Sequence, residues 1–194
     1  MDALFHLRDM IASLDGPLVD DLCARARLPR NESLYALSGS AAPSLEALAG
    51  PYAESTTLAG RVLLLRPFYV QILLAALCAP GGGDAERNAC LAADMAGLNS
   101  LARRLALSIH VATRKREALP DALQTALRTG DPVRVEQAIT NLAVESDVIA
   151  RVEKRARKNG APDGTVRRLA DLYANDIIPL SRKIQVHGLL ASPT

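Results

Sequence analysis

A chain of 194 residues is long enough for one domain with a substantial core, and we predict a single domain over residues 1–194. A net charge of only +2 argues against a nucleic-acid partner. Three cysteines are too few, and odd in number, for a disulfide framework, which favours a reducing compartment. Because the N-terminus has no basic segment followed by an apolar run, we expect a cytoplasmic protein without a signal peptide.

The first predicted helix covers residues 2–28, where leucine and isoleucine recur every three or four positions along one helical face. Gly16 and Pro17 interrupt this pattern. Proline lacks a backbone N–H and clashes with the preceding turn, so we expect a kink or a break there. Residues 29–58 are rich in proline and glycine and are predicted to form a long loop with at most one short helical turn.

The next helix is predicted over 58–79, with a possible break near Pro67. The most apolar stretch of the chain, 62–79, lies within it. Arg66, Pro67 and Gln71 interrupt this stretch, which favours a buried core helix over a membrane span.

After the flexible segment 80–83, four more helices are predicted. Asp84 is a plausible N-cap for the longest of them, and Gly130 a plausible end for the shortest. No segment alternates convincingly between apolar and polar residues, so no strand is predicted. We therefore expect an all-α bundle of about six helices. The predicted helices are 2–28, 58–79, 84–118, 120–128, 132–159 and 165–190.

Polar residues on inward helical faces need an explanation, because such faces are normally apolar. Arg104 and Lys115 are separated by three helical turns, so they share a face about 16 Å apart along the axis. Two i, i+4 pairs and an arginine of the first helix complete this set. They are Asn141 with Glu145, Ser181 with Gln185, and Arg8. Long arginine-rich helices carry many solvated cations, so periodicity alone supports nothing more specific than an all-α domain.

Four blocks of sequence together resemble the eukaryote-type helical chorismate mutases of fungi and plants. The first block, 7–35, resembles that family's first helix and the segment after it. Residues 98–105, Leu-Asn-Ser-Leu-Ala-Arg-Arg-Leu, resemble its Leu-Gln-Ser-Leu-Ser-Arg-Arg-Ile run. Residues 139–145, Ile-Thr-Asn-Leu-Ala-Val-Glu, and the Ile-Ile-Pro-Leu-Ser segment at 177–181 resemble two further family blocks. The blocks occur in the family's order and cover about half of the chain.

The resemblance implies a role for each matching residue. Arg8 and Arg104 would each bind a substrate carboxylate, and Lys115 would bind the ether oxygen and a carboxylate. Asn141 and Glu145 would contact a carboxylate and the ring hydroxyl. Ser181 and Gln185 occupy positions that are Thr and Glu in the fungal enzymes and Ser and Gln in the small bacterial helical mutases. Val111 and Ile178 would supply apolar walls.

The resemblance also implies the reaction, the rearrangement of chorismate to prephenate. This reaction is pericyclic and transfers no proton, so it needs no metal, cofactor or nucleophile. It needs a folded substrate and donors aimed at the oxygen where negative charge develops. The expected partners are chorismate and a second copy of the chain in a homodimer, with no nucleic acid and no membrane.

Three alternatives remain open at this stage. Two are enzymes of the same fold, an isochorismate-pyruvate lyase and an aminodeoxychorismate mutase. The third is a non-catalytic helical binding module. The chain is also much shorter than the fungal and plant enzymes between Tyr35 and Asp94, and we find no match there to the elements that sense tyrosine and tryptophan. We therefore expect neither amino acid to regulate it.

Overall fold

The computed structural model describes residues 3–35, 42–117 and 120–191, with side chains from Asp9 onward. Every regular element in these ranges is helical, which confirms the predicted all-α class. In chain order the elements are α1 (Ala3–Arg25), a 3₁₀ turn (Glu32–Leu34), α2 (Leu45–Glu54), α3 (Leu58–Phe68), a π-helical segment (Tyr69–Leu73), α4 (Leu74–Leu77), a 3₁₀ turn (Asp84–Glu86), α5 (Arg87–Glu117), α6 (Asp121–Thr129), α7 (Pro132–Ile139), α8 (Leu142–Lys158), α9 (Asp163–Leu172), a second π-helical segment (Tyr173–Ile177) and α10 (Ile178–Ala191).

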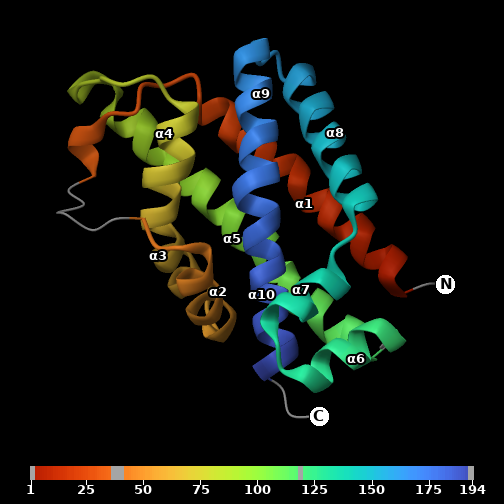
Figure 1. The fold of residues 1–194 in the computed structure, drawn as a ribbon. Helices are drawn as coiled ribbons and strands as arrows, with labels where there is room; N and C mark the ends of the chain where they lie inside the picture. The colour runs from red at the N-terminus through yellow and green to blue at the C-terminus, as the bar shows by residue number, and fades with distance from the viewer. Residues whose placement is uncertain (1–2, 36–41, 118–119, 192–194) are drawn as a thin grey trace.

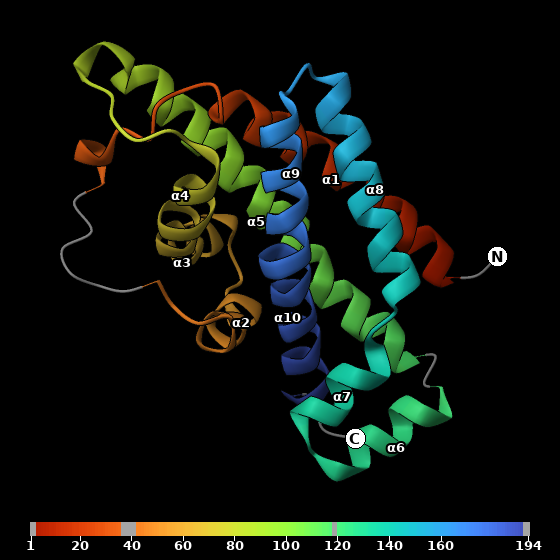
Figure 2. The same cartoon turned by 45° about the horizontal axis from the view of Figure 1, so that its top comes forward.

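The helices are arranged around one long rod formed by α9, the second π segment and α10 (Figures 1 and 2). Helix α8 lies on one side of this rod and α2, α3 and α4 lie on the other, while α1 crosses behind it (Figures 1 and 2). Helix α5 packs against both α1 and α10. Helices α6 and α7 pack against each other at the end of the bundle, where α7 also contacts α10.

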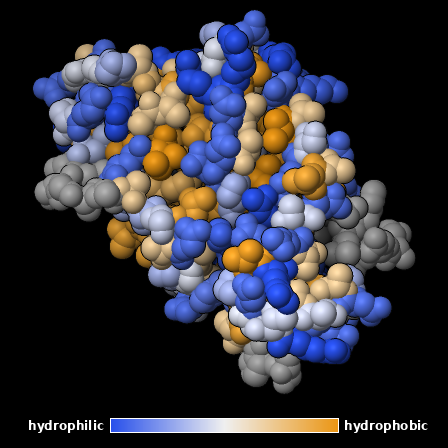
Figure 3. Space-filling view, viewed as in Figure 1, coloured by the Kyte–Doolittle hydropathy of each residue, from blue (hydrophilic) through white to orange (hydrophobic). Residues whose placement is uncertain are grey.

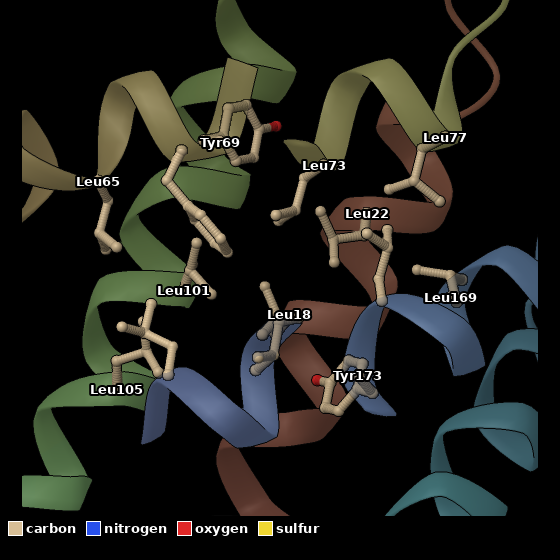
Figure 4. Close-up of a cluster of buried hydrophobic side chains, with 14 of the residues drawn as sticks. Leu18, Leu22, Leu65, Tyr69, Leu73, Leu77, Leu101, Leu105, Leu169 and Tyr173 are labelled. Carbon is tan, nitrogen blue, oxygen red and sulfur yellow. The ribbon is translucent and has the colours of Figure 1, made fainter. Parts of the chain in front are cut away.

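The core lies between α1, α3–α4, α5 and the α9–α10 rod (Figure 4). Leucines from each helix meet there together with the rings of Tyr69 and Tyr173, and all are essentially inaccessible to solvent. A smaller apolar cluster joins the C-terminal half of α5 to α6, α7 and α10. This second cluster fixes the end of the bundle beside which the candidate site lies.

The stretch Leu58–Leu77 is long and apolar enough to cross a membrane by length and composition, although only a third of its most apolar window is buried. One side of it is part of the core. Leu65, Phe68, Tyr69 and Leu73 are buried there.

Neither expected proline break occurs. Helix α1 continues through Gly16 and Pro17. Pro17 is exposed, while the nearby Leu18 and Leu22 are fully buried, so packing holds the helix together across the lost hydrogen bond. Pro67 lies inside α3 and is followed by the first π segment, a widened turn that lets the helix continue into α4.

The prediction of a long loop over 29–58 is wrong for α2. Ser44 caps this helix, since its Oγ accepts a hydrogen bond from the backbone N–H of Ala47 at 3.2 Å. Leu48, Ala49 and Tyr52 form a buried stripe against the core. The glycines and prolines of the segment obscured this short amphipathic pattern.

The predicted helix 132–159 is in fact two helices, α7 and α8, with a corner at Thr140 and Asn141. Asn141 has extended backbone angles, and its side chain accepts a hydrogen bond from the N–H of Val144 at 3.1 Å. It is therefore the N-cap of α8, and its i, i+4 spacing from Glu145 does not reflect a shared helical face. The corner and α2 raise the number of continuous helices in the described ranges from the predicted six to eight.

A buried polar cluster ties the end of α1 to α5. Arg25 is fully buried, and its Nε donates to Asp94 Oδ1 at 2.6 Å. The Tyr35 hydroxyl, in the segment after α1, donates to the other oxygen of the same carboxylate. This anchor fixes the two helices that carry Asp15 and Arg104.

Candidate active site

A single cavity of about 560 Å³ lies where α1, α5, α10 and the corner between α7 and α8 meet. Its volume is in the range of small-molecule sites. Eight of the nine residues singled out from the sequence line it, although they come from segments up to eighty positions apart. They are Arg104, Val111, Lys115, Asn141, Glu145, Ile178, Ser181 and Gln185.

Arg8 is the ninth residue. It belongs to α1, but its side chain lies outside the described part of the structure. Its neighbours Asp9, Ile11 and Ala12 line the cavity, so the first turns of α1 form part of the wall. The predicted role of Arg8 stays a prediction.

Arg104 occupies the middle of α5 and is almost completely buried. Its Nε donates to Asp15 Oδ1 of α1 at 2.6 Å. Its Nη1 is buried and has no hydrogen-bond partner within the described part of the chain. A buried donor without a partner is costly, and a carboxylate entering the cavity would satisfy it.

Asp15 and Tyr173 lie close to this arginine. Asp15 Oδ2 and the Tyr173 hydroxyl are also buried; the two groups interact with each other, but neither makes a well-formed hydrogen bond to a described residue. Burial, together with the nearby Asp15 carboxylate, raises the pKa of Tyr173 well above its ordinary value, so this hydroxyl stays protonated. The polar groups around Arg104 are thus only partly satisfied by the protein.

Lys115, three turns along α5 from Arg104, meets Gln185 of α10. Its Nζ donates to Gln185 Oε1 at 2.9 Å and to the backbone oxygen of Ile139 at 3.3 Å. The amide nitrogen of Gln185 in turn donates to the backbone oxygen of Ser181 at 3.2 Å. The Ser181 hydroxyl is paired with that of Ser108 at 2.6 Å. These contacts fix a row of donors along one wall of the cavity.

Glu145, in the first turn of α8, accepts hydrogen bonds from Arg182 of α10. Arg182 Nη1 lies 2.8 Å from each of the two Glu145 oxygens. The carboxylate is half-buried and lines the cavity, as does Arg182 itself. Val111 and Ile178 are buried and add apolar surface between the polar groups.

Three residues important to this geometry were not selected from the sequence: Asp15, Ser108 and Arg182. Asp15 did carry a signal, because Ile11, Asp15, Leu18 and Leu22 share one helical face on which a carboxylate is unexpected. Ser108 and Arg182 differ little from ordinary helix residues, and only their pairing across helices in the structure distinguishes them.

The composition of the wall indicates what the cavity can do. It is lined by four cationic residues and three carboxylates, the cations being Arg104, Lys115, Arg151 and Arg182. Its described lining includes no histidine or cysteine to act as a base or strong nucleophile. Across the described residues, no group of three or more His, Cys, Asp or Glu is placed to hold a metal ion. The arrangement suits binding and orienting an anionic substrate.

Comparisons with known proteins show what this chain and its fold resemble. A curated protein from Emericella nidulans is 27% identical over 138 residues, which cover 63% of this chain and 52% of that protein. One from Pichia angusta is 29% identical over 126 residues, which cover 58% of this chain and 45% of that protein. Both are chorismate mutases. This chain therefore spans about half the length of the curated relatives it matches.

Solved structures give the same answer for the fold. The chorismate mutase of Candida albicans, in complex with L-Trp, superposes with a TM-score of 0.75 at 19% identity, covering 97% of this chain and 90% of that one. The chloroplast chorismate mutase of Zea mays superposes with a TM-score of 0.76 at 20% identity, covering 97% of this chain and 95% of that one. No family model matches the sequence. The comparisons confirm the resemblance to the eukaryote-type helical chorismate mutases, and the superpositions show that the chain has their fold.

Proposed function

We propose that this protein is a chorismate mutase that rearranges chorismate to prephenate, the step toward phenylalanine and tyrosine. The observation that carries the proposal is the convergence of eight family-matched residues on one cavity beside the buried, unpartnered Nη1 of Arg104. Helical periodicity alone gives no reason for side chains from separate segments of the chain to meet in one cavity.

The proposed mechanism is conformational restraint combined with electrostatic stabilisation. Arg104 and Arg8 bind the two substrate carboxylates, and Asn141 and Ser181 assist them, so the flexible vinyl ether is held folded against the ring. Arg104 can do this while bonded to Asp15, because its Nε faces Asp15 and its Nη1 remains free.

Lys115 and Gln185 are held together at the position where we place the ether oxygen. As the carbon–oxygen bond breaks, negative charge develops on this oxygen, and donors that are already oriented stabilise it without reorganising. Removing one such donor commonly costs about 3–4 kcal/mol of barrier. Glu145 accepts the hydrogen bond of the ring hydroxyl.

The decisive experiment is to incubate the purified protein with chorismate. We expect chorismate absorbance to fall while prephenate appears in a one-to-one ratio by NMR. Release of pyruvate from isochorismate, without prephenate from chorismate, would support the lyase alternative. Failure to convert chorismate would refute the proposal.

We further propose that the protein works as a homodimer in a reducing compartment such as the cytoplasm. Apolar side chains gather over α3 and α4 on the face seen in Figure 3. Leu58 and Leu63 of α3, and Leu91 and Met95 of α5, are exposed. Exposed apolar surface of this kind supports an interface. Cys23, Cys78 and Cys90 are all free and buried, which supports the reducing compartment.

We also propose that tyrosine and tryptophan leave the activity unchanged, because the segment between Tyr35 and Asp94 is short. Initial rates at sub-saturating chorismate should be flat across millimolar concentrations of either amino acid. Sigmoidal kinetics relieved by tryptophan would contradict this proposal.

A further inference from the structure

Arg182 is a cavity residue to which the resemblance gives no role. It follows Ser181 on α10 and lies between two carboxylates of neighbouring helices. Its Nη1 donates to both oxygens of Glu145 at 2.8 Å, and its Nε donates to Glu136 Oε1 of α7 at 3.2 Å. The three side chains are only about a fifth exposed, so solvent screens their charges weakly.

Glu136, one of the two partners of Arg182, also binds a second cation. Lys183 donates to the other oxygen of Glu136 at 2.9 Å and forms an ion pair with Glu46 of α2 at 2.9 Å. Burial would lower the pKa of Arg182, but its hydrogen bonds to Glu145 and Glu136 outweigh burial and raise it. The guanidinium is therefore a fixed positive charge bonded to the Glu145 carboxylate, and both side chains line the cavity.

This arrangement affects what Glu145 can bind. A carboxylate offers about four acceptor positions, so Glu145 can accept from a substrate group while bonded to Arg182. A neutral hydroxyl is a suitable donor. An ammonium group at the same place would be repelled by Arg182, because it would bring a second cation close to it. Its attraction to Glu145 would also be weaker, because Arg182 already compensates part of the charge of this carboxylate.

We propose that Arg182 is a specificity-determining residue: its charge, paired with Glu145 at the cavity wall, makes the cavity select a substrate with a ring hydroxyl over the analogue with a ring amine. The inference rests on the proposed function and names which member of that substrate class the site accepts. The amine of the analogue is allylic and is protonated at pH 7, so it faces the repulsion described above.

The test compares kcat/KM for chorismate and for 4-amino-4-deoxychorismate at pH 7. The unmodified protein should prefer chorismate. Arg182→Gln should lower this preference by about tenfold or more, since a like-charge contact is removed. The change should appear mainly in KM, because the charge acts on bound substrate and transition state alike. Arg182→Lys keeps the cation and should retain most of the preference.

Two further variants sharpen the result. Glu145→Gln removes the carboxylate but leaves Arg182, so it should change the preference in the opposite direction, further toward chorismate. Arg134→Gln, an equal charge change on the exposed face of α7, should leave the preference unchanged. Circular dichroism establishes that each variant is folded.

An unchanged preference in folded Arg182→Gln would overturn the inference while leaving the proposed function standing. If that variant does not fold, a fall in preference in Glu145→Gln would overturn it equally. Turnover of neither compound by the unmodified protein would refute the proposed function and this inference with it.

Discussion

At the residue scale, Arg104 shows that a substrate-binding candidate can also be part of the core. The resemblance predicts a functional cation at this position of α5 but does not indicate which residue faces it. In the structure its partner is Asp15, an equally buried carboxylate. We therefore expect removal of this arginine to affect both turnover and stability.

Arg104→Ala should lose turnover and also stability. Removing one partner of a buried ion pair leaves an uncompensated charge and costs about 3–5 kcal/mol. The double variant Asp15→Leu/Arg104→Met removes both charges, so it should recover most of the lost stability without recovering activity. Urea denaturation and the chorismate assay measure the two effects separately. A single variant as stable as the parent would show that the pair does not stabilise the fold.

The second residue-scale prediction concerns pH and Gln185. Its amide carries N–H groups at every pH, whereas a carboxylate can donate to the ether oxygen only when protonated. Gln185→Glu should therefore make kcat fall as pH rises through the pKa of the new carboxyl group. Burial would raise that pKa and the adjacent Lys115 ammonium would lower it. The parent should show no such fall.

The measurement is kcat against pH from about 5 to 9, a range that spans the expected titration of a perturbed carboxyl. Gln137→Glu is the matched control, because it makes the same substitution on the exposed face of α7. If Gln185→Glu keeps the profile of the parent, Gln185 does not donate to the reacting oxygen.

At the element scale, apolar periodicity predicted the long helices well, because α1, α5 and α9–α10 each bury one continuous stripe. It failed where local and tertiary effects compete. Pro17 suggested a break, but burial of Leu18 and Leu22 outweighs the lost hydrogen bond. Asn141 matched a helical spacing, yet its side chain caps a new helix. Neither the continuous helix at Pro17 nor the new helix at Asn141 can be predicted from local sequence, since both depend on contacts that only the tertiary fold supplies.

The contact between α1 and α8 yields a prediction at this scale. Arg155 and Asn159 of α8 hydrogen-bond to Asp20 of α1. The hydrogen bonds from Arg155 lower the pKa of Asp20 despite partial desolvation. A lowered folded-state pKa contributes stability above the unfolded value of 3.8, and this contribution is lost as pH falls through the folded value.

Asp20→Asn should therefore destabilise the protein at pH 7 and make little difference once the pH is below the lowered folded-state pKa, where the carboxylate is protonated in both states. The loss should not exceed about 1 kcal/mol, because both side chains are more than a third exposed. Thermal melting of both proteins at a series of pH values is the measurement. Exposed Asp121→Asn on α6 serves as the control. A loss independent of pH would exclude the ion pair as its cause.

At the scale of the whole molecule, the candidate site lies within one chain. Its walls come from α1, α5, the α7–α8 corner and α10, and these meet because the anchors around Arg25 and Arg104 fix α1 on α5. The resemblance supplied the identity of most site residues. It could not supply their pairing, since Asp15, Ser108 and Arg182 act through neighbours that are distant in sequence.

Because the described walls of the site all come from one chain, we expect turnover not to depend on a partner, although the exposed apolar residues of α3 and α5 support a dimer. Leu63 and Met95 are 68% and 54% exposed, and α3 contacts α5. Burying two glutamates in an apolar interface is costly, so Leu63→Glu/Met95→Glu should convert the dimer to a monomer. The monomer should retain turnover per site, because no cavity residue is altered.

Sedimentation equilibrium at several concentrations gives the oligomeric state, and the chorismate assay at the same concentrations gives the activity. Val133→Glu is the matched control: Val133 is 61% exposed on α7, away from α3, so its substitution should leave the dimer intact. A parent protein that is monomeric at all concentrations would contradict the proposed dimer. A monomeric double variant that is folded but inactive would show that the second copy is needed to hold α1 and α5 in their active arrangement.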